Sequence, residues 1–242
     1  MKFPYDILYE DEQVLVVNKP AGLLVVPDRW DKNKRNLIHV VREARPEQYL
    51  MNAHRLDRDT TGVLVIAKSH ESLSALAEQF RKKETVKTYV ALVRGRPELE
   101  ETIVDLPIGP NLARPGLSRV DKVHGKHAVT RVRVVEKFRR LTLVRAFPET
   151  GRSHQIRVHL AAIGCPIVAD SDYGDGQPLM LSNFKRSYKE SGFEKPMMNR
   201  QALHAEQLVL AHPKTGEPVT FTAPWPRDLE VAVKQLRKYA LA

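Results

Sequence analysis

The densest group of polar side chains in this sequence is the run Asn52-Ala53-His54-Arg55-Leu56-Asp57-Arg58-Asp59, which comes shortly before the apolar run 62–67. Side chains at the entrance to a buried strand are held at the edge of a rigid sheet, where functional groups are often displayed. A carboxylate in such a place can act as a nucleophile or as a general base. Asp57 is therefore a candidate catalytic residue, with a charged surface loop as the alternative interpretation.

A second polar group follows about a hundred residues later, in the run 150–160. Ser153 is expected to cap a helix there, with His154 and Arg157 projecting from its first turns. Apolar neighbours on both sides of Arg157 predict a partly buried stem. A buried arginine requires a carboxylate partner, because an unpaired internal charge is strongly destabilising. We hypothesise that Asp57 is this partner and that the guanidinium group keeps it ionised.

Five histidines raise the alternative of a metal-dependent hydrolase. His124 and His127 have no nearby acidic residue, while His154 and His159 are five positions apart and would splay on a helix. Neither pattern, even with His54 added, resembles a metal-ligand set. No metal site is expected.

The balance of charge favours a polyanionic partner. The 242 residues include 39 Lys and Arg against 29 Asp and Glu, which gives a formal net charge of +10. Such an excess attracts nucleic acid. The positive net charge is less compatible with the alternative of a glycosidase in which Asp57 and Asp59 form the carboxylate pair. Glycine-rich phosphate-binding motifs are lacking in the sequence, so no nucleotide cofactor is expected.

The composition is that of an ordinary globular protein, with 42% hydrophobic and 28% charged residues. The one cysteine, Cys165, excludes an intramolecular disulfide and a cysteine-rich zinc site. The sequence has no signal peptide and no apolar run near the ~20 residues that span a bilayer. We expect no membrane partner and a cytoplasmic location.

Strand-like runs dominate the framework that must position these side chains. Strands are expected at 13–18, 62–67, 88–93, 129–138, 141–147, 206–210 and 218–222. Helices are expected after Ser69, after Ser153 with Gly164 as the stop signal, and over 228–239. The pattern predicts the α+β class, with a largely antiparallel mixed sheet and flanking helices. Residues 1–242 are expected to form a single domain.

A basic, weakly periodic insertion is expected at about 175–200. It contains Lys185, Arg186, Lys189, Lys195 and Arg200. A solvated surface segment is one interpretation, and a basic arm that closes over RNA is the other.

Several motifs, taken in order, resemble those of RluA-type pseudouridine synthases, which isomerise uridine in RNA. They are Val17-Asn18-Lys19-Pro20-Ala21-Gly22, His54-Arg55-Leu56-Asp57-x-x-Thr60-Thr61-Gly62, Lys87-Thr88-Tyr89-Val90-Ala91, Gly151-Arg152-x-His154-Gln155-Ile156-Arg157-Val158-His159 and Leu203-His204-Ala205. The resemblance is in register from about Tyr5 to Trp225. Thr61 stands where serine is usual, and we expect a form without the N-terminal S4-like domain that many relatives carry.

The resemblance implies a pseudouridine synthase fold and a role for each motif residue. Asp57 would be the nucleophile or the base, and sequence does not decide between the two. Tyr89 would stack on the flipped uracil, Arg157 would pair with Asp57, and Arg55 would fill the gap left by the base. RNA contacts are expected from Arg55, His54, Arg152, Lys185 and Arg186.

The resemblance also implies partners. The substrate would be structured ribosomal or transfer RNA, with no cofactor and no obligate protein partner, and a monomer is expected. A non-catalytic RNA chaperone on the same fold is the alternative from a different class. The presence of all three expected catalytic side chains argues against it.

Overall fold

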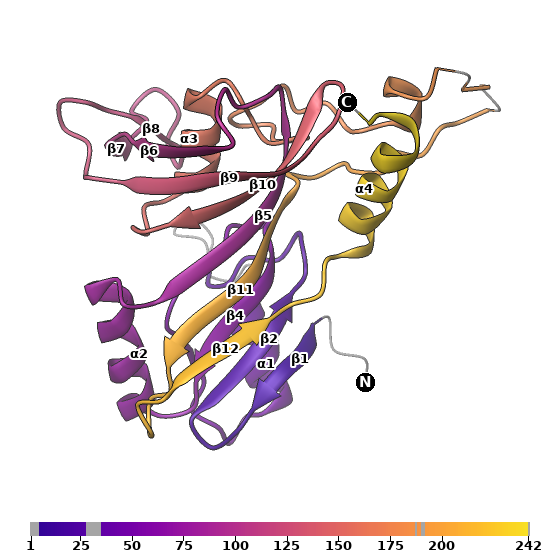
Figure 1. Cartoon of the computed structure of the whole chain (residues 1–242). Helices are drawn as coiled ribbons and strands as arrows, with labels where there is room; N and C mark the ends of the chain where they lie inside the picture. Colours follow the sequence, from indigo (N-terminus) through magenta and orange to yellow (C-terminus); the bar gives the residue numbers. More distant parts are fainter. Residues whose placement is uncertain (1–4, 28–34, 187, 190–191, 242) are drawn as a thin grey trace. The chain divides into compact units, whose positions relative to one another are not determined.

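A computed structural model describes residues 5–27, 35–186, 188–189 and 192–241 (Figure 1). The chain divides into two compact units. The first unit comprises the described residues of 1–87 and 205–224, and the second comprises those of 88–204 and 225–242. Among the described residues, no helix combines the length and apolar character needed to cross a bilayer.

The first unit is built on a sheet in the strand order β1-β2-β4-β11, in which β3 pairs with β4 and β12 pairs with β11. Its elements are β1 (Asp6–Glu10), β2 (Val14–Lys19), α1 (Leu37–Ala44), β3 (Met51–Asn52), β4 (Thr61–Ala67), α2 (His70–Lys82), β11 (Leu203–Ala211, from Ala205 on) and β12 (Pro218–Thr222). The pairs β1–β2, β2–β4, β3–β4 and β11–β12 are antiparallel.

The core of the first unit explains the apolar run of β4, whose seven residues are all buried. Val63 and Val65 pack in one cluster with residues of β2, β11 and β12, and Leu76 of α2 belongs to the same cluster. Ser69 caps α2 as predicted, because its hydroxyl oxygen accepts a hydrogen bond from the Ser72 amide at 3.0 Å. A rigid sheet therefore underlies the turn that precedes β4.

Within the second unit the strands pair in the order β5-β10-β9-β6, and β7 and β8 form a separate hairpin. Its elements are β5 (Val86–Arg94, from Thr88 on), β6 (Glu101–Asp105), β7 (Ile108–Pro110), β8 (Ser118–Val120), β9 (Val129–Lys137), β10 (Leu141–Pro148), α3 (Gln155–Ala162), the short 3₁₀ helix η1 (Leu181–Asn183) and α4 (Arg227–Tyr239). The pairs β5–β10, β9–β10, β6–β9 and β7–β8 are antiparallel.

The predicted α+β class and largely antiparallel sheet are confirmed, as are the 129–147 hairpin and the terminal helix. The elements that were not predicted from sequence are β1, β3, β6, the β7–β8 hairpin, α1 and η1. The expected surface insertion at 175–200 has a more ordered frame than predicted, because Leu179 and Met198 form a bridge and are both buried. Residues 187, 190 and 191 of this segment lie outside the described part.

The predicted Ser153 cap of α3 is wrong. The residue before the helix is His154, in the left-handed conformation with φ 56°, and it makes no side-chain capping bond. The Gln155 side chain closes the turn before α3 instead. Its carbonyl oxygen accepts hydrogen bonds from the Arg152 amide at 3.0 Å and from the Thr150 hydroxyl at 2.6 Å. The turn is therefore closed by the first residue of α3 and not by a residue before the helix.

Gly62, at the start of β4, allows a close backbone approach within the first unit. Its φ is +113°, and a Cβ atom there would lie 2.1 Å from the carbonyl oxygen of Ala205 on β11. Such a separation is far inside van der Waals contact, so the backbone itself would have to move. This accounts physically for a glycine directly after Thr60-Thr61.

We predict that Gly62→Ala lowers the unfolding free energy by at least ~1 kcal/mol more than Gly216→Ala does, measured by urea denaturation. Alanine at positive φ costs ~1–2 kcal/mol at both sites. Gly216 has φ +74° and open space around it, so only Gly62→Ala adds the overpacking cost of ~1–3 kcal/mol or more. Equal losses in the two variants would contradict the proposed close approach.

Candidate active site

Asp57 lies in the turn between β3 and β4 of the first unit. The Thr60 amide donates to the Asp57 carbonyl at 3.2 Å and closes the turn. Leu56 is buried, with 7% of its surface exposed, whereas Asp57 is partly exposed and Arg55 is exposed. The buried Leu56 thus anchors the backbone between the exposed Arg55 and the partly exposed Asp57.

The buried ammonium group of Lys19, at the end of β2, fixes this turn. Lys19 is 0% exposed, and its Nζ donates to the carbonyl oxygens of Pro20 at 2.8 Å, Leu23 at 2.7 Å and Arg58 at 2.8 Å. An ammonium group has three N–H donors, so each can be satisfied by one carbonyl. The Arg58 bond ties the residue next to Asp57 to the end of β2.

His54 fixes the same turn to β4 from the other side. Its Nε2 accepts a hydrogen bond from the Val65 amide at 3.1 Å, and its ring stacks on Phe80 with the centroids 4.7 Å apart. Burial, helped by the positive charge of Lys87, lowers the pKa of His54 to about 3. The imidazole is therefore neutral near pH 7 and brings no charge to a phosphate. The expected RNA contact of His54 stays a prediction, and a positioning role accounts for its geometry.

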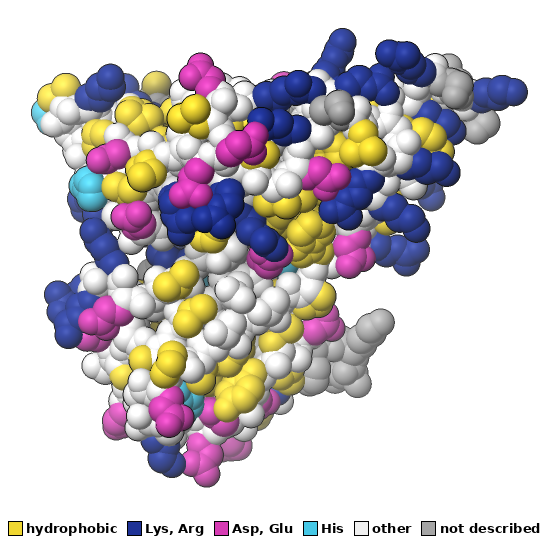
Figure 2. All heavy atoms as spheres, viewed as in Figure 1, with side chains coloured by type: hydrophobic (Ala, Val, Ile, Leu, Met, Phe, Trp, Pro, Cys, Tyr) yellow, Lys and Arg dark blue, Asp and Glu magenta, His cyan; other side chains and the backbone are white. Residues whose placement is uncertain are grey.

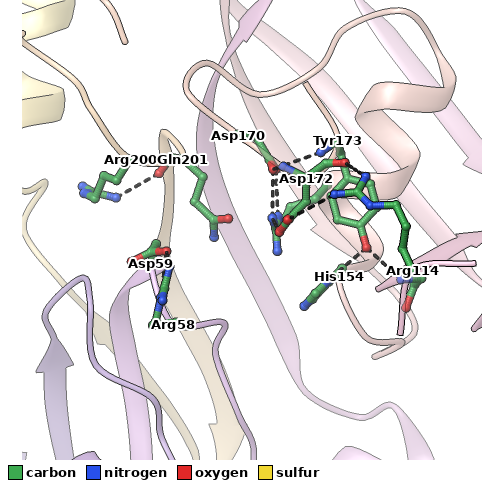
Figure 3. Close-up of polar contacts among 11 residues, drawn as sticks. Arg58, Asp59, Arg114, His154, Asp170, Asp172, Tyr173, Arg200 and Gln201 are labelled. Atoms are coloured by element: carbon green, nitrogen blue, oxygen red, sulfur yellow. Dashed lines mark hydrogen bonds and ion pairs between the residues drawn. The ribbon is translucent and has the colours of Figure 1, made fainter. Parts of the chain in front are cut away.

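Arg157 is buried in α3 of the second unit, and it bonds there to Asp170 and Asp172, which Figure 3 labels. Its Nε and one terminal nitrogen donate to the two oxygens of Asp170 at 2.7 and 2.8 Å, and the latter nitrogen also donates to Asp172 at 2.6 Å. Burial would raise the pKa of Asp170, but its bonds to Arg157 and to two backbone amides hold the pKa below its usual value. Because Asp170 and Asp172 already supply carboxylates, the burial of Arg157 does not by itself require a bond to Asp57. The pairing of Arg157 with Asp57 stays a prediction.

The motif residues around Arg157 also anchor the β7–β8 hairpin. The guanidinium carbon of Arg157 lies 4.8 Å from the ring centre of Tyr173, whose hydroxyl bonds with His154 Nδ1 at 2.8 Å and accepts from the Ser118 amide at 2.8 Å. Arg114 of the hairpin donates to the Asp172 carbonyl at 3.0 Å. These residues, shown in part in Figure 3, form one polar network within the second unit.

Three of the histidines that suggested a metal hydrolase, His54, His154 and His159, form hydrogen bonds with protein groups. Both ring nitrogens of His159 lie 2.9 Å from an oxygen, one from the Thr130 hydroxyl and one from the Leu106 carbonyl. In the described part of the chain, no group of three or more His, Cys, Asp or Glu side chains could hold a metal ion.

The other expected site residues are dispersed over the second unit. Tyr89 is partly buried in β5, opposite Ala146 of β10. Arg152 donates from Nε to the His127 carbonyl at 3.0 Å. Lys185 and Arg186 lie together along one pocket.

Sequence reasoning missed residues that position the site, namely Lys19, Asp170 and Asp172. Lys19 was taken only as part of a turn and motif, and its bonds to the carbonyl oxygens of Pro20, Leu23 and Arg58 leave no pattern in side-chain types. Asp170 and Asp172 had a signal, since a buried arginine was predicted to need a carboxylate and this acidic pair follows on the chain.

Comparisons with known proteins identify the family of this chain. The RNA pseudouridylate synthase family matches residues 13–162. The chain is 41% identical to ribosomal large subunit pseudouridine synthase C of Escherichia coli (strain K12), over 96% of this chain and 70% of that protein. It is 39% identical to the protein of the same name from Haemophilus ducreyi, over 96% and 69%.

A solved structure is also similar. Human RNA Pseudouridylate Synthase Domain Containing 4 superposes with a TM-score of 0.72 at 28% identity, over 96% of this chain and 93% of that one. The chain therefore belongs to the RNA pseudouridylate synthase family, as its RluA-type motifs predicted. It is an RNA-modifying enzyme that isomerises uridine to pseudouridine.

We predict that His54→Gln flattens the pH dependence of the unfolding free energy between pH 7.5 and 5. The folded-state pKa of His54, about 3, lies below the roughly 6.5 expected when unfolded, so protonation favours unfolding. The stabilisation is complete above pH 6.5 and is lost as the pH falls toward 3, with a slope approaching ~1.4 kcal/mol per pH unit. Glutamine can still accept from the Val65 amide but does not titrate.

Urea unfolding at each pH measures this slope. The control is His39→Gln on α1, an exposed histidine 3.3 Å from Glu43. Parallel curves for wild type and His54→Gln would show that His54 does not titrate as a buried group.

Proposed function

We propose that this enzyme modifies large-subunit ribosomal RNA and that Asp57 is its catalytic carboxylate. The observation that carries the proposal is the turn in which Asp57 is partly exposed while Lys19 and His54 fix the backbone on either side. A reacting group held to a fraction of an ångström is what catalysis by positioning requires. The named relatives support ribosomal RNA over transfer RNA as the substrate.

The reaction accounts for the need for one carboxylate and no cofactor. The N1–C1′ bond of uridine breaks, the base turns, and C5 bonds to C1′. C5 loses a proton and N1 gains one, so no electrons are exchanged with another molecule. A carboxylate can either attack the nucleoside or remove a sugar proton. Both routes begin from ionised Asp57.

Roles for the remaining residues follow from their chemistry. Tyr89 is proposed to stack on the uracil after it leaves its helix, which offsets part of the unstacking cost of a few kcal/mol. Arg55, exposed beside Asp57, is proposed to occupy the vacated place. Arg157 is proposed to orient the site. Arg152 is proposed to contact phosphates.

The two units are proposed to work as one catalytic domain, because the family match at 13–162 begins in the first unit and ends in the second. We also propose that the enzyme acts as a monomer, and in the cytoplasm, where a modifier of ribosomal RNA meets its substrate.

We predict that Asp57→Asn lowers the rate of pseudouridine formation in large-subunit RNA at least ~10³-fold while RNA binding changes little. The amide keeps the shape of the carboxylate but neither attacks carbon nor removes a proton, and losses of this size are typical when a reacting group is removed. Time courses with purified variants and unmodified large-subunit RNA measure the rate, fluorescence anisotropy measures RNA binding, and pseudouridine mapping gives the modified position.

Asp59→Asn is the matched control. Asp59 is two residues away, also a carboxylate, and 3.0 Å from the exposed Arg58 guanidinium group. It should keep most of its activity. If Asp57→Asn stays active, or if Asp59→Asn is as inactive, Asp57 is not the catalytic carboxylate.

A further inference from the structure

The second unit contains a pocket of about 770 Å³ that none of the proposed catalytic residues lines. It lies between the β9–β10 connection, the segment 175–186 and the carboxyl-terminal part of α4. Its volume falls within the range of small-molecule sites in proteins. Figure 2 shows dark-blue side chains gathered over the η1 and α4 region, with yellow apolar ones among them.

The pocket is strongly cationic. Of the described residues, five cations and one carboxylate line it, a net charge of +4: Arg94, Arg139, Arg140, Lys185, Arg186 and Asp175.

These cations differ in how far they are engaged. Arg94 lies 2.8 Å from the Asp175 carboxylate, so these two charges offset each other. Arg139 donates to the Tyr239 carbonyl at 2.7 Å. Arg140 and Arg186 are exposed and take part in no ion pair among the described residues. They are available to a ligand with negative charge.

Aromatic and apolar groups lie beside these charges. Phe138 is fully buried, whereas Phe184 is only partly buried and lines the pocket. Lys185 Nζ lies 5.2 Å from the ring centre of Tyr239. A ligand that fits must therefore carry negative charge and also offer a flat apolar face.

A single-stranded nucleotide segment has both properties. Its phosphates suit arginine and lysine, and its unpaired bases stack on aromatic side chains. Duplex RNA keeps its bases stacked internally and offers mainly phosphate and ribose edges. An acidic peptide would satisfy the cations but would leave the apolar face of Phe184 without a matching group.

We propose that this pocket binds a single-stranded segment of the substrate RNA, with phosphates on Arg140 and Arg186 and a base on Phe184. The inference rests on the proposed function, since it takes RNA as the substrate. It gives the predicted RNA contacts of Lys185 and Arg186 a defined place and adds Arg140 and Phe184 to them. The enzyme thereby gains a recognition site built from residues separate from its catalytic set.

The test uses the full-length protein and a fluorescent ten-nucleotide single-stranded RNA, with affinity measured by anisotropy across a salt series. Arg140→Ala combined with Arg186→Ala should weaken binding at least tenfold at 0.1 M salt. It should also reduce the slope of log Kd against log salt by about 1.4, or ~0.7 for each lost phosphate contact. Phe184→Leu should weaken binding about fivefold or more without changing that slope.

The matched control combines Arg81→Ala with Lys82→Ala on α2, which removes the same charge from an exposed site paired with Glu78. Its affinity should change less than twofold. Thermal melting establishes that each variant is folded. Equal losses in the control and pocket variants would overturn the proposal, because only the overall charge would then matter.

Two further outcomes separate the pocket from the proposed function. If the pocket variants bind RNA like the wild type while pseudouridine still forms in an Asp57-dependent way, the pocket proposal fails and the proposed function stands. If polyglutamate competes with the RNA probe and its binding is lost in Arg140→Ala with Arg186→Ala but not in Phe184→Leu, the pocket takes an acidic protein segment and the RNA proposal is overturned.

Discussion

A single buried ammonium group holds together the part of the molecule from which the proposed catalytic aspartate is displayed. Removing the charge of Lys19 from water is expensive, and the cost is offset only because three carbonyl oxygens at 2.7–2.8 Å take the place of water. Those oxygens belong to the segment after β2 and to Arg58. Lys19 thus links the chain after β2 to the turn before β4. The hydrogen bonds between the strands do not make this link.

Arg157 plays the corresponding part in the second unit. Its charge is balanced by Asp170 and Asp172, and its face lies against Tyr173, which also bonds to the β7–β8 hairpin. Among the described residues, each unit therefore buries a cation that groups of the same unit engage. A motif residue with a proposed catalytic role can therefore also stabilise the fold around it. Experiments must separate the effect of its mutation on catalysis from its effect on stability.

How far the sequence predicts the structure depends on where the partners of a residue lie. The hairpin over 129–147 and the Ser69 cap follow from local patterns and were predicted correctly. The prediction of a Ser153 cap is wrong because Gln155, the first residue of the helix, supplies the hydrogen bonds that close the turn. Motif order identified Asp57 as a candidate, and relatives of known name agree with the family.

The partners of the buried charged residues in the site were also hard to predict from sequence. A buried arginine indicates that a carboxylate lies near but does not say which. Asp170 was not anticipated as a partner of Arg157, and the pairing of Arg157 with Asp57 stays a prediction. For Lys19 the acceptors are main-chain carbonyls, which every residue carries. No pattern of side chains could have predicted them, and the missed pocket around Arg140 likewise depends on segments distant in sequence.

The most direct test of the anchoring by Lys19 is amide hydrogen exchange in Lys19→Met, which keeps the length of the side chain and removes its charge. Exchange in residues 55–60 should accelerate at least ~10-fold, a loss of ~1.4 kcal/mol of local stability, while residues 63–66 of β4 keep their protection. Unchanged protection in residues 55–60 would contradict the account, because the turn would then hold Asp57 without the ammonium group.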